Sequence, residues 1–159
     1  MKIEFKEQQK FTQWYLWLVL IGISVIPVFG IVKQIVLGEQ FGTRPMSDYG
    51  LIIFLILALG LLVFFWIMRL ETEIDKNEIR MKFFPFVEKK VEWKDIKKAR
   101  IVKYDFVGYG IRIGGEYGTV YNTKGNKGLA IELKNGKKFV IGTHKEEELN
   151  RILKKNLSD

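Results

Sequence analysis

The chain contains no cysteine and a single histidine, His144, among its 159 residues. The missing thiols exclude a disulfide framework, a thiolate nucleophile and a zinc–thiolate site. One histidine is too few for most histidine-based metal sites and catalytic relays, and its place just after a helix-capping pattern predicts an exposed surface position. The sequence therefore predicts no catalytic residue and no metal site.

Apolar residues, by contrast, make up 48% of the chain, beside 28% charged residues, and the two kinds are segregated. Two long runs, Phe11–Val32 and Tyr49–Met68, contain no charged residue. As helices they reach about 33 Å and about 30 Å, enough to cross a hydrocarbon core of about 30 Å. Buried helices of a soluble core would show a polar stripe, which Leu51–Met68 lacks. The sequence therefore predicts a transmembrane hairpin with helices over about 11–32 and 49–68.

The distribution of basic residues predicts how this hairpin is oriented. The linker Lys33–Asp48 carries two basic residues, whereas three lysines precede the first run and four basic residues follow the second within about fifteen positions. The flanking residues are Lys2, Lys6, Lys10, Arg69, Lys76, Arg80 and Lys82. The positive-inside rule places both termini in the cytoplasm. We expect residues 1–70 to form the N-terminal segment and the hairpin, and residues 71–159 to form a cytoplasmic domain.

The net charge of +8 follows from the same arrangement. From Arg69 to Asp159 there are 21 Lys and Arg residues against 14 Asp and Glu residues, and this excess faces an anionic leaflet. Since no recognised nucleic-acid motif accompanies the charge, we expect no nucleic-acid partner.

The region after the second run predicts strands followed by one helix. Apolar and polar residues alternate over 70–74 and 79–83 around the polar turn Asp75–Glu78, which predicts a hairpin. A second hairpin is predicted by alternation over 129–133, the type I′ turn pair Asn135-Gly136, and the apolar residues that follow it. Further short strands are expected at 91–93, 99–106, 110–113 and 118–121.

A helix is predicted to begin at Thr143, because Thr143-x-x-Glu146 matches a capping box. Its apolar stripe is Leu149, Ile152, Leu153 and Leu157. About seven strands and one closing amphipathic helix predict a small α+β domain, a β-barrel or sandwich with one end covered.

Several short segments of this region resemble a bacterial pleckstrin-homology-like domain fused to two N-terminal transmembrane helices. They are Leu70-Glu71-Thr72, Phe83-Phe84-Pro85-Phe86, Trp93-Lys94-Asp95-Ile96, Gly110-Ile111-Arg112, Gly125-Asn126-Lys127-Gly128 and Gly142-Thr143. The resemblance implies a seven-stranded barrel capped by the last helix, no cofactor, and a place in the bacterial inner membrane. Since members of this group largely lack an assigned activity, it implies a fold more than a function.

A basic and aromatic stretch is the first candidate contact surface. If the first strand leaves the membrane at Leu70 and the second returns antiparallel to it, Phe83–Phe86 arrive near the headgroups with lysines beside them. The alternative is that these phenylalanines belong to the core. The candidate contacts with a lipid surface or a partner are Phe84, Phe86, Lys89, Lys90, Lys94, Lys97, Lys98 and Arg100.

A second candidate set offers a guanidinium, amides and ammonium groups that suit a carboxylate, a phosphate or a partner. It consists of Arg112, Tyr121, Asn122, Lys124, Asn126 and Lys127. The alternative is a plain strand-connecting turn. Specific phosphoinositide binding is not expected, because the first hairpin turn, Asp75–Glu78, is acidic rather than basic.

These features predict a non-catalytic membrane protein that binds another membrane protein as a scaffold or accessory subunit. The alternative is a module that responds to anionic lipids of the inner leaflet through its basic and aromatic surface. An enzyme is not expected.

Overall fold

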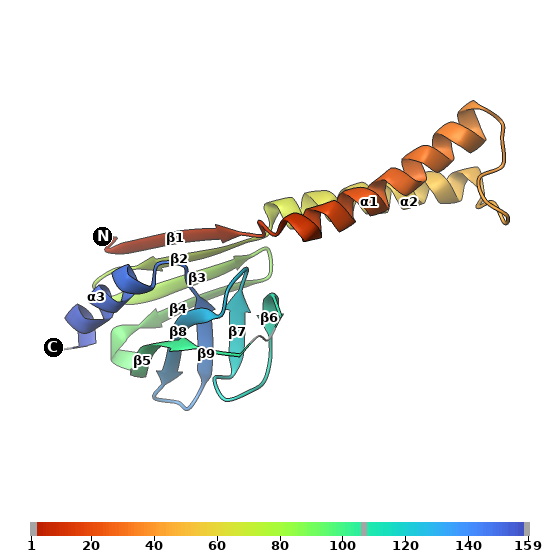
Figure 1. Cartoon of the computed structure of the whole chain (residues 1–159). Coiled ribbons are helices and arrows are strands. Elements are labelled where there is room, and N and C mark those ends of the chain that lie inside the picture. The colour runs from red at the N-terminus through yellow and green to blue at the C-terminus, as the bar shows by residue number, and fades with distance from the viewer. Residues whose placement is uncertain (1–2, 106–107, 158–159) are drawn as a thin grey trace. The chain divides into compact units, whose positions relative to one another are not determined.

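The computed structural model describes residues 3–105 and 108–157 (Figure 1). The chain divides into two compact units. One, here called the helical unit, is Thr12–Ile67, and the other, the β unit, combines Met1–Phe11 with Met68–Asp159. The residues that precede the first apolar run therefore belong to the same unit as the residues that follow the second.

The helical unit contains two apolar helices. Helix α1 (Trp14–Ile31) continues as the π-helical turn η1 (Val32–Val36), and helix α2 spans Asp48–Ile67. Both are long and apolar enough to cross a membrane, over 23 and 20 residues, and most of their large apolar side chains are exposed. The prediction of two such helices is confirmed, with the first ending at Val36 rather than Val32.

Helix α1 packs against α2 along one face, where Leu20, Ser24, Pro27 and Gly30 are buried. A Cβ atom added at Gly30 would lie 2.9 Å from Cδ2 of Leu51 on α2. Small residues on this face therefore let the two helices approach closely.

The β unit begins with a four-stranded antiparallel sheet, sheet A, in the order β1-β2-β3-β4. Its strands are β1 (Phe5–Lys10), β2 (Arg69–Ile74), β3 (Glu78–Phe84) and β4 (Val87–Glu92). Alternate residues of β1, β2 and β3 are buried, as expected for strands with one face on a core. The predicted hairpin around Asp75–Glu78 is confirmed as β2 and β3.

Strand β1 was not predicted. It pairs with β2 from Phe5 opposite Ile74 to Lys10 opposite Arg69. The helical unit is therefore inserted in the chain between two neighbouring strands of one sheet. The inward positions of β1 include Glu7 and Gln9, so the strand lacks the apolar alternation that reveals its neighbours.

A short 3-10 turn, η2 (Trp93–Asp95), leads into a five-stranded sheet, sheet B, in the order β5-β8-β9-β7-β6. Its strands are β5 (Ile96–Lys103), β6 (Gly110–Arg112), β7 (Thr119–Asn122), β8 (Lys127–Leu133) and β9 (Lys138–Gly142). The pair β7–β9 is parallel and the other pairs are antiparallel. The predicted β8–β9 hairpin is confirmed, but its predicted type I′ turn is wrong: Gly136 has a φ of 83° whereas Asn135 does not have a positive φ, and the Gly136 N–H donates to the Leu133 carbonyl, so the strands are joined by a three-residue loop.

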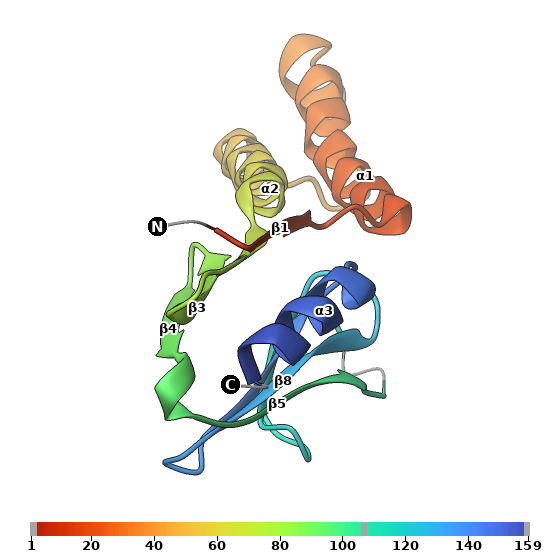
Figure 2. The same ribbon diagram turned by 90° about the vertical axis from the view of Figure 1, so that its left-hand side faces the viewer.

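Helix α3 (Glu146–Leu157) contacts β5 and β1 (Figure 2). It buries Leu149 and Leu153, while the side chain of Leu157 lies outside the described residues. The C-terminal helix predicted from the sequence is thus confirmed. Fully buried side chains of both sheets, such as Phe83, Met81, Leu129 and Ile141, form the core.

The predicted seven-stranded barrel or sandwich is confirmed as a β-rich domain with a C-terminal helix, but it differs from the structure in strand number and in closure. The described residues form nine strands, of which β1 was not predicted, and over 3–105 and 108–157 the two sheets do not close into a barrel. Trp93, predicted to be in a strand, lies in η2. The strand predicted over 99–106 is β5, three residues earlier, and Phe106 lies outside the described residues.

The predicted capping box at Thr143 is also wrong. The Thr143 oxygen accepts a hydrogen bond from the Lys145 N–H (3.0 Å), and its hydroxyl donates to Glu7 on β1 (2.6 Å). The Glu146 carboxylate contacts Nζ of Lys127 rather than the Thr143 N–H, which donates to the Lys127 carbonyl. A long-range partner on β1 therefore replaces the local reciprocal pair.

Candidate functional site

The two candidate phenylalanines lie at the end of sheet A from which the chain continues into α1 and α2. Phe84 is opposite Arg69 in the register, and Arg69 is in turn opposite Lys10. The Arg69 guanidinium lies 5.0 Å from the centroid of the Phe84 ring, and Nζ of Lys82 lies 6.0 Å from it. Phe86 is 55% exposed. This end of the sheet therefore combines exposed aromatic surface with cations.

Phe83, which precedes them in the motif, is different. It is fully buried, and its ring stacks on that of Phe86 with centroids 6.4 Å apart. The alternative that the phenylalanines are core residues therefore holds for Phe83, whereas Phe84 is half-buried and Phe86 is exposed.

Lys89 and Lys90 are neighbours on β4 that line one groove, here called the β4 groove, with a volume of about 500 Å³. The Lys89 ammonium lies 4.6 Å from the centroid of Phe139 and 5.3 Å from that of Tyr121, both buried rings of sheet B. Lys90 is exposed and lies opposite Arg80. The groove is lined by Glu88, Lys89, Lys90, Val91, Thr119, Leu133, Asn135, Lys137, Lys138 and Phe139.

Lys94 and Lys97 are exposed and neutralised by neighbouring carboxylates. Nζ of Lys94 lies 2.6 Å from Glu92, and this hydrogen bond raises the pKa of the lysine. Nζ of Lys97 lies 2.7 Å from Glu132 and lowers the pKa of that glutamate, an effect to which Lys138 adds. Such exposed pairs leave little free positive charge for a ligand.

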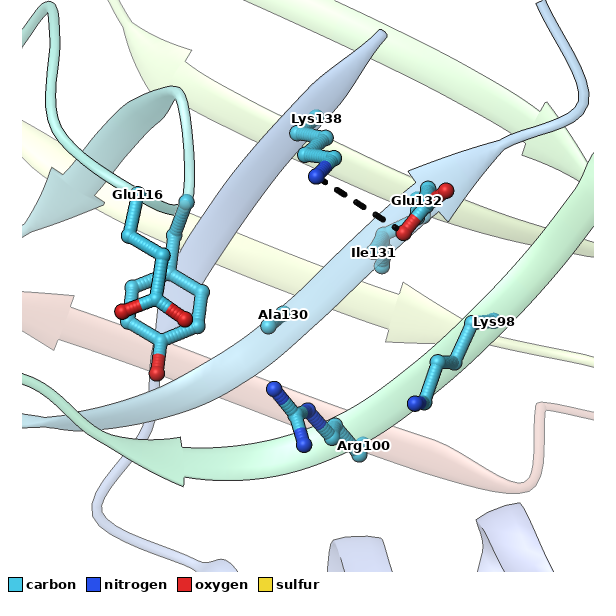
Figure 3. Close-up of a pocket in the computed structure, with 8 residues that line it drawn as sticks. Lys98, Arg100, Glu116, Ala130, Ile131, Glu132 and Lys138 are labelled. Carbon is cyan, nitrogen blue, oxygen red and sulfur yellow. Dashed lines mark ion pairs between the residues drawn. The ribbon is translucent and has the colours of Figure 1, made fainter. Parts of the chain in front are cut away.

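Lys98 and Arg100 line a different pocket, on sheet B, of about 90 Å³. Figure 3 shows these two side chains rising from β5, with Glu132 on β8 and Lys138 on β9 across from them. Lys138 and Glu132 form an ion pair of 3.9 Å. The walls are completed by Glu116, Tyr117, Ala130 and Ile131. The volume suffices for a few water molecules or one small ion.

The predicted basic stretch therefore does not form one surface. Its residues are divided among the end of sheet A, the β4 groove, the exposed pairs near η2 and the small pocket on sheet B. The cause is the chain reversal at η2, which transfers the residues that follow from sheet A to sheet B.

The second candidate set is also divided. Tyr121 is buried under Lys89, and its ring meets Phe139 edge-on at 6.5 Å. Arg112 and Lys124 are exposed, Asn126 is half-buried, and Lys127 is paired with Glu146. The six residues therefore do not converge on one anion.

Asn122 is buried on the opposite face of β7 from Tyr121. Its Nδ2 donates to the Tyr104 hydroxyl at 3.3 Å. Burial raises the pKa of Tyr104, and the hydrogen bond from Asn122 partly offsets this. Both residues belong to the interior of sheet B rather than to an open site.

The acidic turn between β2 and β3 is a buried structural element. The Asp75 carboxylate accepts hydrogen bonds from the N–H groups of Asn77 and Glu78 and from Arg80, at 2.8, 3.0 and 3.0 Å. Burial alone would raise the pKa of Asp75, but these hydrogen bonds and the Arg80 charge together hold it below its ordinary value. The Trp93 indole donates to the Asp75 carbonyl, so the turn is tied to η2.

A buried polar network on β1 was missed by sequence analysis. The Glu7 carboxylate accepts from the Thr143 hydroxyl (2.6 Å) and from the His144 N–H (2.8 Å). The Gln9 amide donates to the Gly142 carbonyl (2.7 Å) and accepts from the Thr123 hydroxyl (3.1 Å). The only signal in the sequence is the pair of phenylalanines at residues 5 and 11 that flanks these polar residues. The network joins β1 to the ends of β7 and β9.

His144 is exposed, as predicted, and its ring nitrogen contacts the Lys124 carbonyl at 3.2 Å. Among residues 3–105 and 108–157, the structure gathers no group of three or more His, Asp or Glu side chains that could hold a metal ion.

Comparison with known proteins gives no further identification: no protein-family model matches the chain, and no curated protein matches it.

Proposed function

We propose that the chain is a multi-pass protein of a bacterial inner membrane, with both termini and the β unit in the cytoplasm. In this proposal it is a non-catalytic scaffold or accessory subunit that binds another membrane protein. The observation that carries the proposal is the pairing of β1, which precedes the helical unit, with β2, which follows it.

This pairing constrains how the helices can be placed in a bilayer. Lys10 is four residues before the start of α1, and Arg69 is two residues after the end of α2. Because Lys10 and Arg69 are register partners, both ends of the helical unit must lie on the same side of any membrane that it crosses. Two crossings satisfy this condition, and a single crossing does not.

The exposed apolar flanks of both helices support the membrane placement. The side chains of Leu18, Val25, Ile56 and Leu57, for example, are 56–66% exposed. Such surfaces are stable in lipid or against apolar helices of another protein, but not in water. The basic flanks and the sparsely charged linker then favour a cytoplasmic β unit.

The surface of the β unit supports binding rather than catalysis. Among the described residues, its charged side chains line several open hollows, which adjoin one another at Glu88, Lys90 and Lys138, instead of converging in one enclosed pocket. A binding module needs only such complementary surfaces, whereas an enzyme needs a group of residues arranged around one reacting atom.

A pleckstrin-homology-like fold is part of the proposal. It is supported by a four-stranded antiparallel sheet that leads into a second sheet and then into a C-terminal helix. The parallel pair β7–β9 and the strand contributed by residues before the helices are departures from a simple seven-stranded plan.

Co-purification from native membranes in mild detergent, followed by mass spectrometry, tests the scaffold proposal. The matched control is a chain in which the helical unit is replaced by a two-residue turn, so that the β unit alone is presented. We expect a membrane protein in near-stoichiometric amount with the full chain and less of it with the control. Recovery of the full chain alone would contradict the proposal.

A second candidate function is a response to anionic lipids, favoured by the cluster of Arg69, Lys82 and Phe84 with the exposed Phe86. Its position at the end of sheet A that leads into both helices would bring these side chains to the headgroups. Each unpaired basic residue near an anionic surface contributes about 1 kcal/mol; Arg69 and Lys82 contribute less, because Glu71 lies 2.6 Å from Arg69 and Glu88 lies 3.8 Å from Lys82.

Vesicle co-sedimentation of the β unit measures this second function. On vesicles containing phosphatidylglycerol, Lys82→Gln with Phe86→Ser should reduce binding about tenfold, while Lys76→Gln should not. Equal binding by both variants and the unchanged β unit would count against a lipid response.

A further inference from the structure

The β4 groove follows the free edge of a sheet. Strand β4 is the last strand of sheet A, so one of its edges has no neighbouring strand in that sheet. Four consecutive residues of β4, from Glu88 to Val91, line the groove. Side chains of consecutive residues point to opposite faces of a strand, so a groove lined by all four runs along the strand's edge. Edge strands offer backbone N–H and C=O groups to an added strand.

The groove carries positive charge that the chain does not neutralise. In the part of the chain that the structure describes, Lys89, Lys90 and Lys137 have no carboxylate within 4.0 Å. The groove's single glutamate, Glu88, is 3.8 Å from Lys82, and Lys138 is 3.9 Å from Glu132. Three ammonium groups around one groove are therefore available to a negatively charged ligand.

Of these three lysines, Lys89 has the ammonium group whose position is restricted by neighbouring rings. It is half-buried, and its ammonium is held over two aromatic rings, 4.6 Å from Phe139 and 5.3 Å from Tyr121. The rings restrict the ammonium's position without neutralising its charge. Lys137 lies across the groove on the β8–β9 turn, so an occupant would have cations on both sides.

We propose that the β4 groove binds an extended acidic segment of a partner protein, which adds to β4 as a further strand and places its carboxylates against Lys89, Lys90 and Lys137. The inference rests on the proposed scaffold function and names the surface that the partner uses. Main-chain hydrogen bonds to the edge provide affinity, and the lysines select for acidic side chains.

The lining favours this occupant over a phosphate group. Lysine ammonium groups attract carboxylates and phosphates alike, so the preference comes from the free edge of β4, which an extended peptide backbone can pair with and a phosphate group cannot. At about 500 Å³ the groove is also larger than one small anion requires, and Thr119 and Asn135 add polar groups to its lining.

The probe is a fluorescent peptide with blocked ends, six residues long like β4, in which glutamate alternates with valine. Alternation puts every carboxylate on one face of the added strand. Binding to the full chain in uncharged detergent is followed by fluorescence anisotropy. Two further peptides carry N-methyl groups on the odd or on the even amides, which keeps the charge and blocks pairing along one edge.

The variant Lys89→Gln with Lys137→Gln removes one cation from each side of the groove. The matched control, Lys76→Gln with Lys103→Gln, removes the same charge from exposed positions outside the groove. We expect the groove variant to bind the acidic peptide about tenfold more weakly and the control less than about twofold. One of the two N-methylated peptides should lose binding.

Three results would overturn the inference: no binding of the peptide, equal weakening by both variants, or full binding of both N-methylated peptides. If binding of phosphatidylglycerol vesicles, rather than of the peptide, depends on Lys89 and Lys137, the occupant is a lipid headgroup and the inference is wrong.

Co-purification with the groove variant separates the groove proposal from the scaffold proposal. Loss of the partner supports the groove, whereas its retention overturns the groove and leaves the scaffold function standing. Failure of the unchanged chain to recover any partner contradicts the scaffold function itself.

Discussion

Replacing the helical unit with a two-residue turn should yield a soluble, folded β unit. Phe11 and Met68 flank the helical unit. Phe11 comes directly after Lys10 and Met68 directly before Arg69, and Lys10 and Arg69 are register partners. Joining Phe11 to Met68 by Asn-Gly therefore closes β1 and β2 as an ordinary hairpin, for which this dipeptide is the preferred type I′ turn. No other part of the β unit needs to change, because its remaining strands follow β2 in the chain.

The comparison chain begins at Met68 and so lacks β1. It loses the buried rings of Phe5 and Phe11, each worth about 3–5 kcal/mol by analogy with the truncation of buried phenylalanines. It also loses four hydrogen bonds from Glu7 and Gln9, at about 1 kcal/mol each. The total of about 10–14 kcal/mol is as large as the whole stability of a typical domain, about 5–15 kcal/mol. The shortened chain should therefore not fold.

Three measurements check this prediction: retention in the supernatant after ultracentrifugation without detergent, dispersion of backbone amide resonances, and a cooperative urea transition. The joined chain should pass all three and the chain from Met68 should fail them. The reasoning about β1 is refuted if the shortened chain unfolds at the same urea concentration as the joined chain, or if the joined chain aggregates like the shortened one.

Other predictions concern single side chains. Glu7→Ala should destabilise the β unit by about 3 kcal/mol, since it leaves the buried Thr143 hydroxyl and the partly buried His144 N–H without their carboxylate, and Glu7→Gln should cost less; urea unfolding of the joined chain measures both. Because the pKa of Asp75 is lowered on folding, its ionised form stabilises the fold above the ordinary pKa of about 3.9, and this contribution disappears as the pH falls through the folded value. Asp75→Asn should flatten the pH dependence of urea unfolding in this range, and an unchanged profile would argue against the hydrogen-bonded turn. Gly30→Val should lower the thermal stability of the full chain in detergent by about 1–3 kcal/mol, because its side chain meets Leu51, whereas Gly22→Val, with nothing within 4 Å of its Cβ, should not.

The helices and the second hairpin were predictable because their signals are local. An uncharged run of twenty or more residues predicts a membrane-length helix from composition alone. Alternation on both sides of Asn135-Gly136 likewise predicts β8 and β9 from a few neighbouring residues, although a three-residue loop replaces the type I′ turn expected between them. Both features depend on neighbours in the sequence, and both are found in the structure.

The features that were missed depend on partners far away in the sequence. Glu7 and Gln9 occupy inward positions of β1 because Thr143, Gly142 and Thr123 satisfy them across more than a hundred residues. Because Thr143 donates its hydroxyl to the distant Glu7, the predicted capping box with Glu146 does not form. A pattern of hydrophobicity cannot reveal a strand whose buried face is polar.

The sequence predicted which basic and aromatic residues are candidate contacts, but not how the fold distributes them over the surface. A run of basic residues from Lys89 to Arg100 is evident in the sequence, yet the bend at η2 divides it between two sheets. Lys137, which completes the β4 groove with Lys89, comes from the β8–β9 turn and has no signal near Lys89. Its contribution depends on the packing of sheet A against sheet B.

Single-cysteine labelling tests most directly whether the helices form a hairpin that holds the β unit in the cytoplasm. The chain has no cysteine of its own, so Gln8→Cys on β1, Lys76→Cys after β2 and Thr43→Cys in the linker each provide one exposed thiol. A membrane-impermeant maleimide added to sealed spheroplasts should label Thr43→Cys at once, and the other two variants only after lysis. Labelling of Gln8→Cys or Lys76→Cys in sealed spheroplasts, or protection of Thr43→Cys, would contradict the proposed topology.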